Sequence, residues 1–336
     1  MSTSIPSNPV PQQPASIFGQ RTDATALHND FARILSHVML GVCILFTVLI
    51  LALLVVVTGY LVSLGFANLH WSFFTRDTIP IGMDGAPGGM RHALVGTLIL
   101  IVMASVIGVP IGMATGVFLS EYESGSWIAK PVRFICDVLA GVPSIVVGIL
   151  GFQLLVAPFG SGFFKNVPYF RDIQGFNAWA GAGALAFIMV PIIARTTEEM
   201  LRLVPGSYRE ASIALGASKA RTILRVVIPS ATSSIVTGVM LAVARVAGET
   251  APLLFTASAS NYLPFDYDSH FPYLHDVNLN GPFPSLTVQV FHDATSSYKD
   301  LNNLAWSGIL VLIVLIFCIN LSVRYVTRTR RTRPRA

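Results

Sequence analysis

Two charged residues, Arg245 and Glu249, lie within an otherwise apolar stretch of the chain. Their spacing of four residues would put both side chains on one side of a helix. An arginine at mid-bilayer costs about 2.5–3.5 kcal/mol on insertion scales, so we expect it to line a watery cavity or hold a partner. Its guanidinium is a planar fork of donors that suits phosphate-like oxyanions. Glu249 would orient this fork or accept a hydrogen bond from a protonated oxyanion.

A purely structural role for Arg245 is the alternative that the sequence leaves open. In that case Arg245 forms a salt bridge that only fixes neighbouring helices, for example with Asp137. Gly248 and Pro252 flank the charged pair and predict a loosened helix. Irregular backbone of this kind is tolerated in a membrane where it lines a cavity.

The composition indicates a membrane protein. Only 12% of the residues are charged and 53% are hydrophobic, whereas about a quarter of a soluble domain is charged. Six apolar stretches are each long enough to cross the roughly 30 Å of bilayer hydrocarbon. They are Val38–Thr58, Ala93–Leu119, Val138–Phe159, Phe176–Ala194, Val226 to about Ala257, and Leu304–Val323. We therefore predict an all-α, polytopic membrane protein with six transmembrane helices.

The two ends of the chain differ from this middle part. Residues 1–33 are rich in Pro, Ser, Gln and Thr and predict a disordered tail. Residues 34–327 would form the six-helix transmembrane domain, and residues 328–336 a basic tail. With six spans, 16 Lys and Arg residues lie on the side of the two termini and five on the other. Both termini are therefore predicted to be cytoplasmic. Since six arginines lie in the last 13 residues, the net charge of +5 does not indicate a nucleic-acid partner.

The longest loop on the predicted outer side, residues 258–303, carries five aspartates and three histidines. No metal-ligand spacing is recognisable among them, so we expect a solvated loop and no bound metal. We expect this loop to form a rim that contacts an extracytoplasmic partner.

A polar segment before the fifth apolar stretch predicts a short cytoplasmic helix at about residues 207–219. It is rich in alanine, which favours helix, and Gly216 permits a turn that a side chain would hinder. Taken alone, the segment could be an ordinary basic amphipathic loop helix.

This segment resembles the signature loop of ABC importer membrane subunits, whose pattern is Glu-Ala-Ala, three residues, Gly, nine residues, Ile, any residue, Leu, Pro. Glu210, Ala211, Gly216 and Pro229 match at the same spacing. The departures are small: Ser212, Val226 and Ile228 replace Ala, Ile and Leu. The resemblance extends in one continuous order from about Arg91 to Tyr325.

Further motifs resemble the phosphate-specific branch of these permeases. They are Arg-x-x-Gly-Glu-Thr-Ala-Pro from Arg245, Leu-Ala-Gly-Val-Pro-Ser-Ile-Val-Val-Gly from Leu139, and Arg-Thr-Thr-Glu-Glu-Met-Leu-Arg-Leu-Val-Pro from Arg195. Leu-Phe-Thr-Ala from Leu254 and Asn-Leu-Ala-Trp from Asn303 favour the A-type subunit over its C-type companion.

The resemblance implies a type I ABC importer permease fold in a bacterial plasma membrane and the import of inorganic phosphate. It implies three partners: a C-type companion subunit, an ATPase dimer and an extracytoplasmic phosphate-binding protein. Arg245 and Glu249 would belong to the substrate path. Arg209, Glu210, Ala211 and Gly216 would couple the chain to the ATPase.

The chain itself is not expected to be an enzyme. It has no Gly-rich loop ending in Gly-Lys-Ser or Gly-Lys-Thr, and no nucleophile–histidine set is suggested. ATP and magnesium are therefore expected on the partner ATPase, with no cofactor on this chain. Two alternatives stay open: a permease for another oxyanion, such as sulfate or molybdate, and a non-transporting membrane scaffold or sensor. A stand-alone channel is disfavoured, because the signature loop would then have no purpose.

Overall fold

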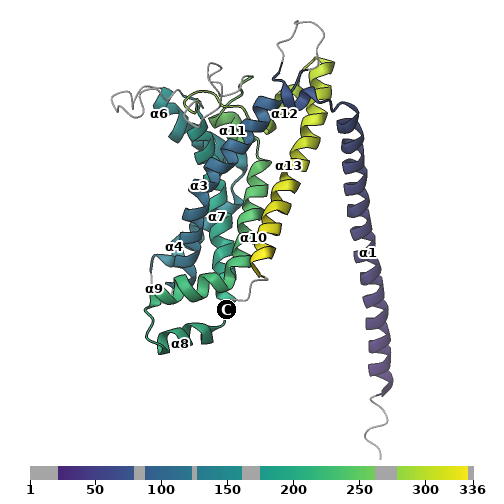
Figure 1. The fold of residues 1–336 in the computed structure, drawn as a ribbon. Coiled ribbons are helices and arrows are strands. Elements are labelled where there is room, and N and C mark those ends of the chain that lie inside the picture. The colour runs from purple at the N-terminus through teal and green to yellow at the C-terminus, as the bar shows by residue number, and fades with distance from the viewer. Residues whose placement is uncertain (1–21, 79–87, 123–126, 161–174, 262–277, 332–336) are drawn as a thin grey trace, which may run out of the picture. The chain divides into compact units, whose positions relative to one another are not determined.

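The computed structural model describes residues 22–78, 88–122, 127–160, 175–261 and 278–331, and these residues form helices without strands (Figure 1). Contacts divide the chain into a unit of residues 1–60 and a unit of residues 61–336. The longer helices are α1 (Thr22–Ala67), α3 (Arg91–Glu121), α7 (Ala178–Arg202), α10 (Ile228–Ala247) and α13 (Lys299–Arg331). The shorter ones are α2 (Ser72–Thr75), α4 (Ala129–Gly141), α5 (Ser144–Gly151), α6 (Ala157–Gly160), α8 (Gly206–Ala214), α9 (Lys219–Thr222), α11 (Ala251–Thr256) and α12 (Leu286–Ala294).

The first unit consists of the greater part of α1. Its described side chains, residues 32–60, are all exposed, although the sequence from Val38 to Thr58 carries no charge. A helix that is apolar all round is expected where lipid or another protein surrounds it. Residues 22–33 belong to this helix, which differs from the disordered tail predicted for residues 1–33. Residues 1–21 of that tail lie outside the described residues.

Close packing of α3 on α7 forms the centre of the second unit. Three glycines of α3, at positions 108, 112 and 116, recur every four residues and face α7. A Cβ on Gly112 would lie 2.7 Å from the Cβ of Ile193, so only glycine permits this approach. Small residues bring membrane helices together in this way. Helix α10 packs on the same α7, and Leu185, Met189 and Ala242 are buried between these helices.

The predicted third span is broken. Helix α4 begins at Ala129, nine residues before the predicted start at Val138, and ends at Gly141; α5 follows with a bend of 107°. Pro143 has no N–H to continue the helix and disfavours helical dihedrals in the residue before it. Val142 accordingly has φ −69° and ψ 132°. The span predicted over Val138–Phe159 is therefore a pair of helices joined at a sharp bend.

By length and composition, the described residues contain five helices able to cross a membrane, and a sixth if the bent pair is one span. The helix of the fifth span begins and ends earlier in the chain than predicted. Its helical course runs from Lys219 to Ala247 and does not continue to Ala257. Helix α13 reaches Arg331, so residues 328–331 of the predicted basic tail are helical, and residues 332–336 lie outside the described part.

Two widened, π-helical turns occur at equal distances before prolines. They are Phe152–Val156, before Pro158, and Ile223–Val227, before Pro229. A proline cannot donate to the carbonyl four residues earlier, and in both cases that carbonyl lies inside the π turn. In each wide turn the residue just before the proline donates five residues back: the Ala157 N–H to the Phe152 carbonyl, and the Ile228 N–H to the Ile223 carbonyl. The helices therefore continue through both sites.

The loop predicted over residues 258–303 contains a buried helix, α12. Leu286, Val288 and Asp293 of this helix are almost fully buried, and α12 packs on α13 (Figure 1). The prediction of a solvated loop was therefore wrong for its second half. Residues 262–277, which include three of the aspartates and two of the histidines, lie outside the described residues.

Candidate functional site

The predicted pair of charged residues is brought together at the end of α10. Arg245 lies in the last turn of that helix, which ends at Ala247, and Glu249 follows the capping residue Gly248. The Arg245 Nε atom is 3.6 Å from the Glu249 Oε1 atom. The Arg245 side chain is 51% exposed and the Glu249 side chain 15%. The predicted loosening of the helix at Gly248 is confirmed, and the two side chains still meet.

The alternative partner considered for Arg245, Asp137, is engaged elsewhere. Its Oδ1 atom is 3.3 Å from Nη1 of Arg195. The same arginine contacts Glu199, with Nε–Oε1 at 3.0 Å. The salt bridge between Arg245 and Asp137 is therefore not formed.

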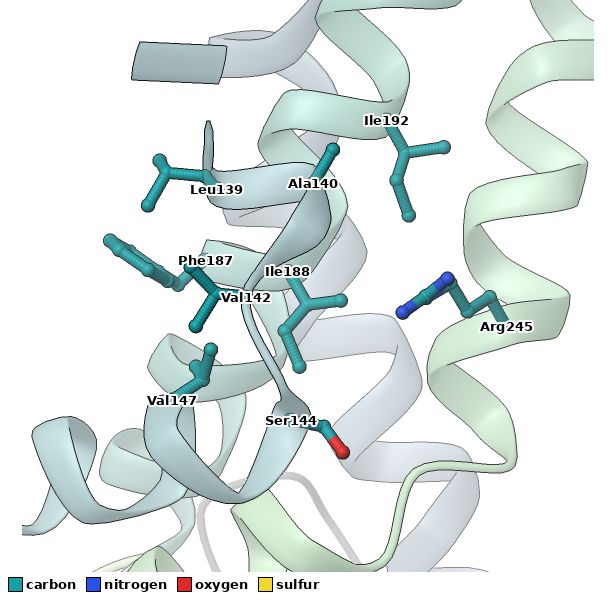
Figure 2. A pocket seen from close by; sticks show the side chains of 9 residues that line it. All are labelled: Leu139, Ala140, Val142, Ser144, Val147, Phe187, Ile188, Ile192 and Arg245. Carbon is teal, nitrogen blue, oxygen red and sulfur yellow. The ribbon is translucent and has the colours of Figure 1, made fainter. Parts of the chain in front are cut away.

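Arg245 lines a small cavity beside the break in the third span. Figure 2 shows its guanidinium extending from α10 toward Ser144 and Ile188. The remaining lining is apolar: Leu139, Ala140, Val142, Val147, Phe187 and Ile192. The cavity measures about 10 Å³, which is roughly the room that one water needs. In this conformation it is too small for a tetrahedral oxyanion.

Close packing fixes the elements around this cavity. Helix α5 lies against α11, and a Cβ on Gly148 would be 2.9 Å from the carbonyl oxygen of Ala251. Glycine at position 148 thus allows α5, the second half of the broken span, to approach the segment that follows Glu249. The break at Val142 and the non-helical residues 248–250 therefore lie near the same cavity.

The predicted cytoplasmic helix is α8, which ends at Ala214, several residues before the predicted end near 219. Gly216 has φ +80°, a left-handed conformation that favours glycine. Its N–H donates to the Ile213 carbonyl at 2.8 Å, which closes the helix. The predicted turn at Gly216 is thereby confirmed. Figure 1 shows α8 beyond the ends of α7 and α10.

The four residues predicted for ATPase coupling separate into two groups. Glu210, Ala211 and Gly216 are exposed. Arg209 instead turns toward the helices: its Nη2 donates to Oε1 of Glu121 at 2.6 Å. It also donates to the carbonyls of Leu201 at 2.9 Å and Val204 at 2.7 Å. The hydrogen bond to Glu121 raises the pKa of Arg209 further above its usual value.

A second buried carboxylate was missed in the sequence. Glu198 is 3% exposed, and its Oε1 accepts from Nη2 of Arg133 at 2.7 Å and lies 2.9 Å from Nη2 of Arg202. The contact to Arg202 could have been anticipated, because the two residues are four apart on α7. The contact to Arg133 ties α4 to α7 across 65 residues, and no local pattern indicates it.

In the part of the chain that the structure describes, no group of three or more His, Cys, Asp or Glu side chains is placed to hold a metal ion. The expectation that this chain binds no metal and no cofactor stays a prediction.

Comparison with known proteins identifies the family. The model of the binding-protein-dependent transport system inner membrane component matches residues 108–332. The phosphate transport system permease protein PstA of Yersinia pestis is 38% identical over 265 residues, 79% of this chain and 80% of that protein. The protein of the same name from Haemophilus influenzae is 36% identical over 289 residues, 86% of this chain and 92% of that protein.

A solved structure supports the fold. It is that of a bacterial ABC transporter involved in the import of the acidic polysaccharide alginate. The match covers 92% of this chain and 100% of the solved chain, with a TM-score of 0.54 and 13% sequence identity. At this identity the likeness concerns the fold alone. The predicted all-α membrane permease fold is confirmed, and the chain belongs to the family of binding-protein-dependent transport system inner membrane components, within which it groups with the PstA-type permease proteins.

Proposed function

We propose that this chain is the A-type membrane subunit of an ATP-driven, binding-protein-dependent importer that moves inorganic phosphate into the cytoplasm. The observation that carries the proposal is the placement of Arg245 beside Glu249, at a break between helices and facing the bend of a broken span. The names of its relatives, phosphate transport system permease proteins, support phosphate as the ligand.

The chemistry of the pair suits phosphate. A guanidinium offers parallel N–H donors to two oxygens of one oxyanion. The distance of 3.6 Å between Arg245 Nε and Glu249 Oε1 is longer than a hydrogen bond. The guanidinium N–H groups therefore stay available to a bound oxyanion. The Glu249 carboxylate accepts a hydrogen bond from the P–OH group of a protonated phosphate. A fully ionised oxyanion lacks that donor, which gives the pair a basis for selecting phosphate.

The small size of the cavity fits a subunit whose path is shared. Arg245 is half-exposed, so its guanidinium faces the surface where the C-type companion is expected. The mechanism is alternating access: ATP closes the ATPase dimer, the coupling helices move, and the spans rock around a cavity lined partly by Arg245 and Glu249, which opens to one side of the membrane at a time. Phosphate reaches the path from an extracytoplasmic phosphate-binding protein.

The energy comes from an ATPase dimer, which holds ATP and magnesium, while this chain catalyses no reaction. The exposed surface of α8, with Glu210, Ala211, Ile213 and Leu215, is the part that enters a groove of that dimer. Both termini and α8 lie on the cytoplasmic side of the bacterial plasma membrane. Arg209 acts in this coupling by holding α8 to the end of α3.

The assembled complex tests this function. The chain is co-purified with its companion and ATPase and reconstituted in vesicles that enclose ATP, and uptake of radiolabelled phosphate is measured with the binding protein outside. Phosphate uptake that requires ATP supports the proposal. Competition by excess sulfate or molybdate would point to another oxyanion. ATP hydrolysis without solute movement would favour the scaffold or sensor.

A further inference from the structure

The backbone of Glu249 lies in a short non-helical segment between α10 and α11. Gly248 caps the first helix with φ −95° and ψ −1°, and Thr250 precedes the second with φ −103° and ψ −48°. Carbonyls at the end of a helix lack partners within that helix and need donors from elsewhere. For Glu249 the donor is the hydroxyl of Thr287, whose Oγ1 lies 3.1 Å from the Glu249 carbonyl oxygen.

Thr287 comes from α12, which is itself firmly held. Its neighbours Leu286 and Val288 are at most 1% exposed, and Thr287 is 5% exposed. The N–H of Leu286 donates to Oγ1 of Thr97 on α3 at 2.7 Å. The Glu249 N–H donates to the Val246 carbonyl at 3.1 Å, which holds the segment on the side of α10. On its other side the segment is held by the Thr287 hydroxyl, which a fixed element presents to the Glu249 carbonyl.

We propose that Thr287 is a positioning residue for the phosphate path, holding Glu249 at the distance from Arg245 that a phosphate ion requires. The inference rests on the proposed function of the pair. The hydroxyl acts through the backbone: it fixes the carbonyl of residue 249, and the side chain that extends from the same residue meets Arg245 at 3.6 Å. Without the donor, the part-buried carbonyl loses its partner and residues 248–250 gain freedom.

The test uses two substitutions at Thr287 and a matched control on the same helix. Thr287→Val keeps the shape of the side chain and removes the donor, whereas Thr287→Ser keeps the donor. Thr295→Val is the control, because the exposed Thr295 hydroxyl donates within its own helix, to the carbonyls of Phe291 at 2.9 Å and His292 at 3.1 Å. Each variant is measured in the full complex, reconstituted with ATP enclosed.

We expect Thr287→Val to assemble normally and to lower the maximal rate of phosphate uptake about tenfold, the loss associated with one buried hydrogen bond. Thr287→Ser should restore the rate to within about twofold of the original, and Thr295→Val should match the original protein. Equal impairment of the Val and Ser variants would show that packing of the methyl group is what matters, and would overturn the proposal. An unimpaired Thr287→Val complex would overturn it as well.

Hydrogen exchange separates this proposal from the proposed function. In Thr287→Val, the amides of residues 249–251, 253 and 254 should exchange faster than in the original complex (Pro252 has none), and Thr295→Val should leave them unchanged. If the original complex moves no phosphate, the proposed function fails. The exchange measurement still shows whether the Thr287 hydroxyl holds the Glu249 backbone. Unchanged exchange at these amides in Thr287→Val refutes the positioning role.

Discussion

Arg209 and Glu121, 88 residues apart in the chain, form a two-pronged ion pair: Nη2 lies 2.6 Å from Oε1, and Nε lies 3.1 Å from Oε2. The pair joins the first turns of α8 to the last residue of α3. Because Arg209 also donates to two carbonyls at the end of α7 and just beyond it, one side chain holds three segments together. Helix α8 is thus attached to α3 and α7 through this guanidinium, and to α9 through a hydrogen bond of 2.9 Å between the hydroxyls of Ser212 and Thr222. None of the α8 side chains is buried.

Replacing Arg209 by lysine should loosen α8. Lysine cannot reproduce the planar fork, and losing charge-assisted hydrogen bonds should cost about 1–3 kcal/mol. We expect several-fold faster proteolysis between residues 203 and 217 and less phosphate moved per ATP hydrolysed. The control is Arg221→Lys at an exposed site. Equal cleavage rates in the two variants would contradict the role of Arg209.

Gly206, the first residue of α8, and Gly216, just beyond its end, offer a matched comparison. A Cβ at either position meets nothing within 4 Å, but only Gly216 has a positive φ, at +80°. Gly216→Ala should cost about 1–2 kcal/mol in that left-handed conformation and should weaken co-purification of the ATPase. Gly206→Ala should have little effect. If Gly216→Ala retains both the ATPase and normal uptake, the turn is not required for coupling.

Replacing Arg245 or Glu249 by alanine should abolish phosphate uptake while the complex still assembles. Arg245→Lys should also be strongly impaired, because an ammonium lacks the fork that engages two oxygens of one oxyanion. Arg225→Ala, at an exposed position earlier in the same span, serves as the control. Normal uptake by both Arg245→Ala and Glu249→Ala would remove the pair from the path.

Asp293 should make the stability of the protein depend on pH. Burial raises the pKa of this carboxyl above its usual value, and contacts with His292 and Gln289 only partly oppose the effect. A raised pKa in the folded state means that the stabilising contribution is present in acid and is lost as pH rises through that pKa. Asp293→Asn cannot ionise and should lose less stability between acid and alkaline pH.

Thermal unfolding of the purified complex at pH 5 and at pH 8 measures this difference. The variant should be at least as stable as the original at pH 8, since its amide keeps an acceptor for Gln289, which donates to Oδ1 at 3.0 Å. The same loss of stability with pH in both proteins would show that Asp293 contributes nothing to it.

The sequence predicted well what depends on local pattern. The apolar runs located the spans, and the Glu210–Gly216 spacing located α8 and its closing turn, because helix periodicity and the freedom of glycine are properties of neighbouring residues. It also predicted that Arg245 and Glu249 meet. The prediction holds although the helix ends at Ala247, because the next turn keeps the Glu249 N–H on the Val246 carbonyl at 3.1 Å.

Contacts between distant parts of the chain could not be predicted in this way. The pairing of Arg209 with Glu121 and of Arg133 with Glu198 depends on how the helices pack. Asp293 lies in a sequence rich in polar residues, so its burial within α12 had no local sign. The bend after Gly141 was obscured because residues 138–159 are apolar throughout, although Pro143 was the residue that could have indicated it.

The break between α4 and α5 determines how a displacement travels through the subunit. A straight helix transmits a displacement along its own axis, whereas two helices joined at a bend of 107° do not. Helix α4 is tied to α7 by the ion pair of Arg133 and Glu198, and α5 packs against α11 at Gly148. A displacement of α8, the proposed coupling helix, would therefore reach Arg245 across packed neighbouring helices and not along one helix axis.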